Sequence, residues 1–493
     1  MSGRAERVDG GRRIAPWRTD AWILAAVGLV LRLGMVVWAT GHIPPTADGE
    51  YYHVVATRIA AGQGYTWLWP DGVVTYAAHY PVGYPAVIGA LYAVLGVAPR
   101  WAMVFNALLG AAAVAAVHQI AASVATRRGA LAAGLAAAVH PALVAYTPAL
   151  MTEGVVAALL ALAGWVVVVA REGRGRSRWG ALVGLGLLLG FATLVRPQVL
   201  IVSPLFGLIA WGRPKGGRPW WQALGGAALV GGIVVATCLP WTVRNCFMMN
   251  AAEPGTFDSN ACSFVSANGG WNLLIGSAPG ATGAWIPIDQ APIPDDCREV
   301  FGEADKDRCF GRAAIRHISQ RPGRWLGLIP RKLAATFNAC GAAAWYLHAA
   351  NAVRFPEWAR WRLDAAEFVF QRVLLLICLV SVWRARPRSE VRLGLAEVSL
   401  AVVLLVGAGF AVQEQGWVAY LALSVGALLL RGRLVDHPPA ALAAASVAAT
   451  AATHALFFGA GRYSLVCYAL LAALAGACWP APVGQERREP NRL

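Results

Sequence analysis

The sequence predicts an all-α polytopic membrane protein with about twelve transmembrane helices. Of its 493 residues, 58% are hydrophobic and only 14% are charged, whereas a soluble globular protein carries about 25% charged residues. So few charges cannot cover a water-facing surface of this size. The apolar residues also fall in long runs, and a helix needs roughly 20 of them to cross a bilayer. The bilayer is therefore expected to be the solvent for most of the chain.

Apolar runs interrupted by short polar segments set the positions of the expected spans. The first run continues past Arg32 to Ala39 with no convincing cleavage site, so it is expected to stay as a span and not to be a signal peptide. The stretch 84–97 is too short to cross and is expected to be interfacial or re-entrant. The twelve spans are expected near 21–39, 101–124, 129–147, 153–170, 179–195, 198–211, 221–241, 366–383, 393–412, 416–431, 438–458 and 463–480.

The basic residues orient this layout. With the N-terminus inside, the cytoplasmic segments hold 23 of the 42 Lys and Arg residues, and the short outer turns hold only Arg196 and Arg462. That asymmetry follows the positive-inside rule. The net charge of +16 therefore reflects membrane loops and not a nucleic-acid partner. Many Arg, few Lys and no organelle signal indicate a bacterial inner membrane.

The layout divides the chain into five parts. A basic cytoplasmic tail (1–20) precedes an N-terminal transmembrane module (21–241) that contains a long first outer loop (41–100). The second long outer segment, 242–365, is long enough to fold as a small extracytoplasmic domain and is expected to mix helix with irregular or extended structure. C-terminal spans (366–480) and a second cytoplasmic tail (481–493) complete the chain.

Five of the nine cysteines lie in the outer segment, where an oxidising compartment permits disulfides. Cys297 with Cys309 is the favoured pair, and the odd number means that at least one cysteine stays free. The sequence does not fix the connectivity. The five are Cys246, Cys262, Cys297, Cys309 and Cys340.

Two acidic residues directly follow the first span. Asp48 and Glu50 can be solvated loop carboxylates, or one of them can be a general base held at the membrane interface. Further along the same loop, the segment from His79 to Pro85, which includes Tyr84, combines aromatic residues with Gly and Pro. Aromatic residues of this kind suit a membrane interface.

Other ionisable residues occupy positions that cost free energy in a membrane protein, which marks them as candidates for a functional site. Several arginines at one outer mouth suit a phosphate, which guanidinium groups bind through paired hydrogen bonds. Arg32 and Arg372 lie inside spans and either serve a function or extend to the membrane surface. His140 is expected to be a packed residue at a helix kink. The outer-mouth candidates are Glu153, Arg196, Arg244, His454 and Arg462.

Several motifs, in this order and topology, resemble the GT-C superfamily of membrane glycosyltransferases. The resemblance is closest to the bacterial branch of protein O-mannosyltransferase-like and lipid A aminoarabinose transferase-like enzymes. It covers about 20–275 and the last two spans. The motifs are AspGlyGluTyrTyr (48–52), GlnGlyTyr (63–65), TyrProValGlyTyrPro (80–85), HisPro to MetThrGlu (140–153), ThrLeuValArgProGln (193–198), ProTrpThrValArgAsn (240–245) and HisAlaLeuPhePheGlyAlaGlyArgTyr (454–463), which ends at Tyr463.

The resemblance implies that a sugar moves from a polyprenyl-phosphate donor to a lipid, glycan or protein acceptor at the outer face. Asp48 matches the family's proposed catalytic base. Many members carry adjacent Asp and Glu there, whereas Gly49 separates Asp48 from Glu50 in this chain, which puts the role of Glu50 in doubt. A lipid phosphate leaves as an anion and needs no general acid. One base and several cations therefore suffice, and inversion at the anomeric carbon is expected.

Three points stay open at this stage. A transporter or flippase of lipid-linked sugars is the alternative function, although transporters tend to show repeated halves and charges at the bilayer midplane. A scaffold without catalysis is a third possibility. A divalent metal held by Asp48, Glu50 and Glu153 is compatible with the sequence, but scattered carboxylates are a weak signal.

Overall fold

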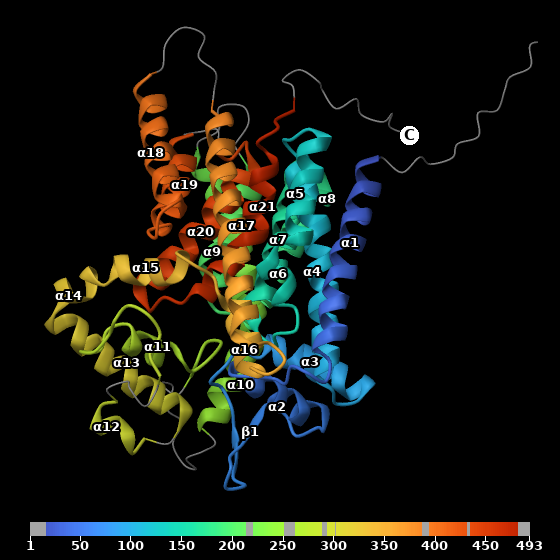
Figure 1. Cartoon of the computed structure of the whole chain (residues 1–493). Coiled ribbons are helices and arrows are strands. Elements are labelled where there is room, and N and C mark those ends of the chain that lie inside the picture. The colour runs from blue at the N-terminus through green and yellow to red at the C-terminus, as the bar shows by residue number, and fades with distance from the viewer. Residues whose placement is uncertain are drawn as a thin grey trace, which may run out of the picture.

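The protein is a bundle of helices that carries shorter helices and a β-hairpin at one end (Figure 1). A computed structural model describes residues 16–212, 220–250, 262–287, 293–300, 302–386, 394–430 and 434–481. The bundle consists of α1 (Pro16–Ala39), α4 (Pro99–Ala122), α5 (Arg127–Val139), α6 (Pro141–Ala145), α7 (Thr152–Glu172), α8 (Gly175–Val195), α9 (Val199–Trp211), η1 (Trp220–Ala223), α10 (Leu224–Asn250), α17 (Glu357–Arg384), α18 (Leu395–Ala411), α19 (Trp417–Leu429), α20 (Pro438–Leu456), the 3-10 helix η4 (Gly461–Cys467) and α21 (Tyr468–Gly476).

Each of the twelve predicted spans coincides with helix, but the count of twelve crossings is not confirmed. Among the described residues, the helices long and apolar enough to cross a bilayer are α1, α4, α7, α8, α10, α17 and α20. The other predicted spans are shorter helices. The third is divided, because α5 ends at Val139 and α6 begins at Pro141, whose ring cannot continue the hydrogen-bonding of the preceding helix.

The long outer segments lie at the same end of the bundle. In Figure 1, α1 runs from the end where the described chain starts to the end that carries α2 (Asp48–Ala60), α3 (Gly83–Leu95) and the hairpin of β1 (Thr66–Leu68) and β2 (Val74–Tyr76). The strands are antiparallel, with Trp67 opposite Thr75. The stretch predicted to be too short for a span is the 13-residue helix α3, which contacts α2 and α8.

The predicted mixed character of 242–365 is not confirmed. Its described residues form α11 (Gly269–Ile275), α12 (Asp295–Arg298), α13 (Glu303–Gln320), α14 (Pro322–Gly327), α15 (Ile329–Phe337) and α16 (Ala342–Ala350). Extended pairing there is limited to one bridge between Ala284 and Gly459. The predicted tails, 1–20 and 481–493, lie outside the described residues except for 16–20 and 481.

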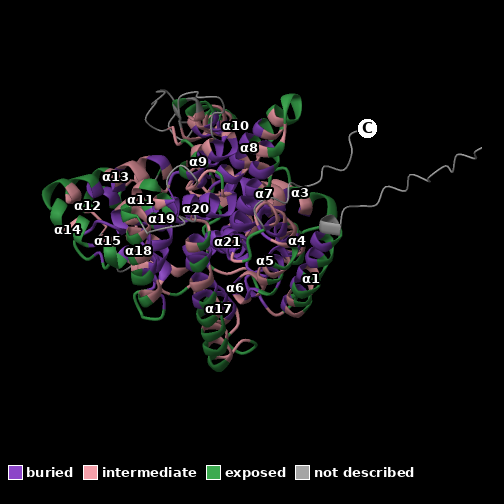
Figure 2. Ribbon diagram, turned by 90° about the horizontal axis from the view of Figure 1, so that it is seen from above, coloured by how far each residue is buried: buried purple, intermediate pink, exposed green. Residues whose placement is uncertain are grey.

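Burial distinguishes the central helices of the bundle from the peripheral ones. Figure 2 shows buried residues concentrated in α7, α20 and α21 and exposed residues on α1 and α17. In the apolar window of α7, 72% of residues are buried, against 33% in α1. The exposed side of α1 carries large apolar side chains such as Trp22, Val30 and Val37. A surface of this kind suits contact with lipid tails and not with water.

Small residues let the central helices approach closely. A Cβ atom added at Gly129 of α5 would lie 2.4 Å from the carbonyl oxygen of Gly476 in α21. A substitution there would push the two helices apart. Close approach at glycine and alanine is the usual way in which transmembrane helices pack, because lipid tails supply no hydrophobic force between them.

The charges predicted inside the first and eighth spans are buried in protein. Arg32 is 2% exposed and donates hydrogen bonds to the carbonyl oxygens of Ala137 and Ala138, in the last turn of α5. The negative end of that helix therefore stabilises the guanidinium, and Arg32 does not extend to the membrane surface. Arg372 is also buried and donates to the carbonyl oxygen of Asn338.

His140 sits at the break between α5 and α6, as predicted. It is fully buried, and its Nε2 atom lies 3.0 Å from Oε1 of Gln371 in α17. The histidine therefore joins the interrupted helix to a distant one.

Two disulfides cross-link the outer segment. Cys297 pairs with Cys309, as predicted, and a second bond joins Cys246 to Cys262. Cys340 is free. The first bond ties α12 to α13 inside a small apolar core that includes Leu274 and Phe310.

Removal of the Cys297–Cys309 bond is expected to destabilise this core. Because the bond restricts the unfolded chain, a Cys297→Ser, Cys309→Ser double variant should lose about 2–4 kcal/mol of local stability. Protease digestion of the outer segment, followed against temperature in detergent, measures the loss. Cys478→Ser, a free cysteine at the opposite end of the protein, is the control. Identical digestion of the double variant and the parent would contradict this prediction.

Candidate active site

Four charged residues from distant parts of the chain meet at the end of the bundle that carries α2, α3 and the hairpin. Asp48 is the first residue of α2, Glu153 the second of α7, and Arg196 directly follows α8. Arg462 lies in η4 and joins the two carboxylates, with NH1 3.1 Å from Asp48 Oδ2 and Nε 3.4 Å from Glu153 Oε1. Arg196 NH1 lies 2.9 Å from the same Glu153 oxygen. We call these four residues the charged cluster.

Asp48 is the accessible carboxylate of the charged cluster. Its side chain is 24% exposed, against 1% for Glu153. Its other oxygen, Oδ1, accepts a hydrogen bond of 3.0 Å from the hydroxyl of Tyr80. Burial, with the neighbouring Asp48 carboxylate, raises the pKa of the Tyr80 phenol well above its ordinary value. The phenol therefore stays protonated and donates.

The backbone before Asp48 is strained. Ala47 has φ 54°, the one positive φ at a non-glycine residue in the described part of the chain. A conformation of this kind costs on the order of 1–3 kcal/mol and persists only where surrounding contacts hold it, which is often at a functional site.

The structure explains why a glycine, Gly49, stands between Asp48 and Glu50. A Cβ atom at Gly49 would lie 2.9 Å from the Leu150 carbonyl oxygen and 3.0 Å from the Tyr346 hydroxyl. A side chain cannot fit between α2 and these groups. Glu50 is exposed and is not brought into the charged cluster. The acidic pattern therefore contributes one carboxylate, Asp48, to this site.

Glu153 is buried among donors. Its Oε1 atom contacts Arg196 and Arg462, and Oε2 accepts a hydrogen bond of 3.1 Å from the Tyr146 hydroxyl. The neighbouring Thr152 hydroxyl accepts a hydrogen bond from Arg196 NH1. Because only 1% of its side chain is exposed, against 24% of that of Asp48, Glu153 suits the task of orienting the two arginines better than that of accepting a proton.

Tyr463 and His454 form an aromatic floor beside the arginines. Their rings stack with centroids 4.1 Å apart, and the Arg196 guanidinium lies 4.8 Å from the centre of the Tyr463 ring. A cavity starts at these three residues and continues between α7, α9 and α20, where its walls include the apolar residues Val156 and Val202. The cavity thus has a cationic end, and its walls combine apolar residues with polar ones such as Ser446 and Thr450.

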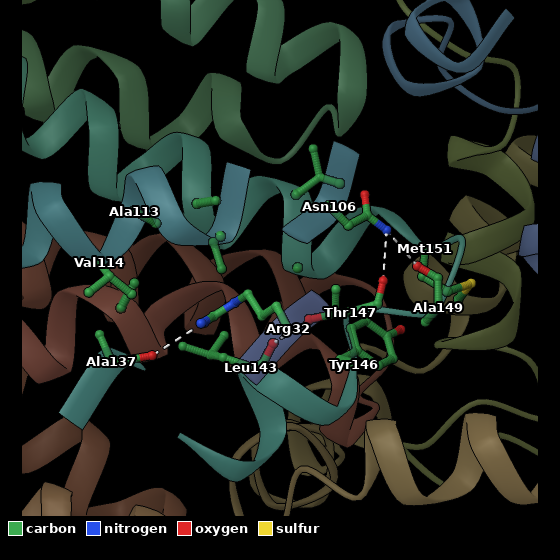
Figure 3. Close-up of a pocket in the computed structure, with 16 residues that line it drawn as sticks. Arg32, Asn106, Ala113, Val114, Ala137, Leu143, Tyr146, Thr147, Ala149 and Met151 are labelled. Atoms are coloured by element: carbon green, nitrogen blue, oxygen red, sulfur yellow. Dashed lines mark hydrogen bonds between the residues drawn. The ribbon is translucent and has the colours of Figure 1, made fainter. Parts of the chain in front are cut away.

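A second cavity is lined by Asn106 and Tyr146, among others. Its surroundings include the hydrogen bonds that hold the backbone leading to Glu153. Figure 3 shows Asn106 of α4 donating to the carbonyl oxygens of Thr147 and Ala149, just before Glu153 in the chain. Asn106 also accepts a hydrogen bond from Tyr84, which is 1% exposed. Tyr84 therefore supports the segment that leads to α7 and does not contact the charged cluster.

Two other predicted residues, Arg244 and His79, lie outside the charged cluster. Arg244 of α10 donates hydrogen bonds to the carbonyl oxygens of Tyr65 and Ala77 in the first loop. The ring of His79 packs against Tyr80, with centroids 4.6 Å apart. Burial lowers the pKa of His79, so the imidazole is neutral at pH 7. Arg244 therefore binds the loop that carries Tyr80, the hydrogen-bond partner of Asp48, and His79 is part of that loop.

The three carboxylates considered as metal ligands do not form a compact group. Arg462 lies between Asp48 and Glu153, and Glu50 is apart from both. Where the structure is described, the one set of three potential ligand atoms within 4.8 Å of one another is Asp296 with Cys297 and Cys309. The two sulfur atoms of that set are already joined in a disulfide.

The charged cluster combines a partly exposed carboxylate with two cations. Its two carboxylates and two guanidinium groups balance formally, and the side chains of Arg196 and Arg462 are 14% and 23% exposed. Preorganised cations of this kind stabilise negative charge that develops on a leaving group. An arrangement of this type can deprotonate a hydroxyl and receive a departing phosphate.

The architecture defines a class: a polytopic helical membrane protein with a charged site at one end of the bundle. Residues 79–243 match the model of one family, described as dolichyl-phosphate-mannose-protein mannosyltransferase. The resemblance inferred from the motifs is therefore confirmed over this segment. The matched segment contains Glu153 and Arg196, whereas Asp48 and Arg462 lie outside it. No curated protein matches the sequence.

Solved structures give a distant match over nearly the whole chain. The oligosaccharyltransferase AglB from Archaeoglobus fulgidus, in complex with an inhibitory peptide and a dolichol-phosphate, is 14% identical with a TM-score of 0.46, covering 94% of this chain and 50% of its own. ArnT from Cupriavidus metallidurans, bound to undecaprenyl phosphate, is 17% identical with a TM-score of 0.37, covering 92% and 77%. The chain thus spans about half the length of AglB. Matches at this level identify no function.

Proposed function

We propose that the protein is an inverting glycosyltransferase that moves a sugar from a polyprenyl-phosphate donor to an acceptor hydroxyl at the extracytoplasmic face. The observation that carries the proposal is the charged cluster, in which one partly exposed carboxylate lies beside two partly exposed guanidinium groups. The family match over residues 79–243 supports the same class of reaction.

The step is a single displacement. Asp48 takes the proton of the acceptor hydroxyl while the hydroxyl oxygen forms a bond to the anomeric carbon of the sugar. The bond from that carbon to the lipid phosphate breaks, and the phosphate leaves as an anion beside Arg196 and Arg462. The leaving group needs no proton, so the second carboxylate, Glu153, is free to orient the arginines. Attack opposite the leaving group inverts the anomeric carbon.

The remaining parts of the chain have matching roles in this proposal. The membrane part would bind the prenyl chain in an apolar groove, with its phosphate beside Arg196 and Arg462. Residues of the loop 41–100 and of the segment 242–365 that lie near the charged cluster would position an envelope lipid, glycan or protein acceptor. The two tails, 1–20 and 481–493, would lie in the cytoplasm of a bacterium, with the site on the periplasmic side of its inner membrane.

The test uses the full chain purified into liposomes, with labelled polyprenyl-phosphate sugars (hexoses and pentoses) and a crude envelope extract as acceptor. Donor-dependent labelling of the extract is the expected result, and an NMR spectrum of the product should show the opposite anomeric configuration to the donor. Retained configuration would overturn the single displacement. Movement of the lipid-linked sugar between leaflets with no transfer would identify a transporter instead.

A further inference from the structure

Hydrogen bonds from several parts of the chain hold the backbone of the loop segment 77–80. Within the loop, the Tyr65 carbonyl oxygen accepts from the N–H of Ala77, and the Tyr65 hydroxyl donates to the carbonyl oxygen of Tyr80. The first two carbonyl oxygens of the segment accept hydrogen bonds from Arg244 of α10, at 2.6 Å, and from the backbone N–H of Ala267, at 2.7 Å. Its amides point the other way: Glu303 Oε2 accepts from the N–H of Ala78 at 2.5 Å and from the N–H of His79 at 2.9 Å.

This segment carries the hydrogen-bond partner of the candidate base. Its last residue, Tyr80, donates to Asp48 Oδ1. The ring of Tyr80 is packed between those of Tyr51 and Tyr52, with centroids 4.9 and 5.3 Å away. Because the ring is enclosed, the position of its hydroxyl follows the position of the backbone at 77–79.

Glu303 comes from a part of the chain that the charged cluster does not include. It is the first residue of α13 and lies 225 residues after Ala78. Ala77 and Ala78 are fully buried, so the amides at 78 and 79 have little access to water and require an acceptor within the protein. One carboxylate oxygen serves both. Arg244 and Glu303 thus hold the two sides of the segment with opposite charges.

We propose that Glu303 is a positioning residue for the transfer reaction. By accepting from the amides of residues 78 and 79, it fixes the loop segment, so that the Tyr80 hydroxyl holds Asp48 in the orientation in which it accepts a proton. The inference rests on the proposed function for its kinetic consequence only. The coupling between α13 and the loop is a structural property that can be measured in a protein of any activity.

Two substitutions separate hydrogen-bond acceptance from charge. Glu303→Gln keeps a carbonyl oxygen at the same position, so it should retain both hydrogen bonds and change kcat by less than about 3-fold. Glu303→Ala removes the acceptor. Because a small displacement of a reacting group costs up to about 10²-fold in rate, this variant should lose about 10- to 100-fold in kcat, with the KM for donor changed less than 2-fold. Glu299→Ala, an exposed carboxylate of the same outer segment, is the control.

Hydrogen exchange measured by mass spectrometry supplies a readout that needs no activity. The peptide containing residues 77–80 should exchange faster in Glu303→Ala than in the parent, and at the parental rate in Glu303→Gln and Glu299→Ala. Peptides from α7 and α20 should not change, which would exclude general unfolding.

The outcomes separate the two proposals. Unchanged exchange in Glu303→Ala, or equal damage in the Gln and Ala variants, would overturn the positioning role. Faster exchange with an unchanged kcat would overturn it as well, because the loop would then move without effect on the reaction. A parent protein that transfers no sugar, with the exchange pattern as expected, would reject the proposed function and leave the coupling of α13 to the loop in place.

Discussion

Replacement of Asp48 by asparagine is expected to reduce sugar transfer about 10²- to 10⁴-fold, which is the contribution typical of a general base. The amide keeps the size and polarity of the side chain, and its oxygen can still accept from Tyr80 or Arg462. It cannot accept the proton of the acceptor hydroxyl. Initial rates with labelled donor, together with donor binding, measure the effect, and donor binding should persist because the substitution leaves both cations, Arg196 and Arg462, in place.

Asp71→Asn is the matched control for this variant, because Asp71 is an exposed carboxylate in the same loop, in the turn of the hairpin. Its transfer rate should equal that of the parent. A parental rate in Asp48→Asn would show that Asp48 is a loop carboxylate. The base would then have to be sought at Glu153 or Glu50, and Glu50→Gln would be the next variant.

Hydropathy located the helices but not their ends. The predicted seventh span stops at 241, whereas α10 continues to Asn250, and the predicted eighth begins at 366, whereas α17 begins at Glu357. An apolar run marks the part of a helix that can lie in lipid. Both helices continue past their apolar runs into segments that contain charged residues such as Arg244 and Arg360. A proline signal was sufficient for the break after Val139, because its mechanism is local.

The charged cluster was largely predictable because each of its members is a charge at the end of an apolar run, where a charge is costly. Tyr80 and Tyr146 were not singled out as partners of the carboxylates, because an aromatic residue near a membrane interface is already explained by anchoring there. Arg244 occupies the same kind of position as Arg196, yet it binds the first loop. The path of a long loop decides which groups surround an arginine, and no local pattern encodes that path.

Glu303 illustrates the limit of sequence reasoning for long-range contacts. It lies in a charged amphipathic stretch, in which a carboxylate usually faces water. Only the tertiary structure brings it against the amides of residues 78 and 79. The sign that it differs from its neighbours is electrostatic: burial raises its pKa, although the two amides act against that shift.

Replacement of Arg462 is expected to have a second large effect, because among the described residues Arg462 alone forms ion pairs with both carboxylates of the charged cluster. Arg462→Gln removes one of two cations at the proposed phosphate position, and the loss of one preorganised group of this kind costs about 10²- to 10³-fold in kcat. Arg462→Lys should recover only part of the rate. A lysine keeps the charge but offers a single point of contact, whereas the guanidinium reaches Asp48 through NH1 and Glu153 through Nε.

The pattern across variants distinguishes transition-state stabilisation from simple loss of structure. Arg354→Gln, an exposed arginine at the same end of the protein, should keep the parental rate, and all variants should elute as monodisperse protein in detergent. If Arg462 acts on the departing phosphate, Arg462→Gln lowers kcat and kcat/KM together. If it contributes only to ground-state binding of the lipid phosphate, KM rises at constant kcat. An equal rate in the Lys variant and the parent would mean that charge alone suffices, and the bridge between Asp48 and Glu153 would then have no part in catalysis.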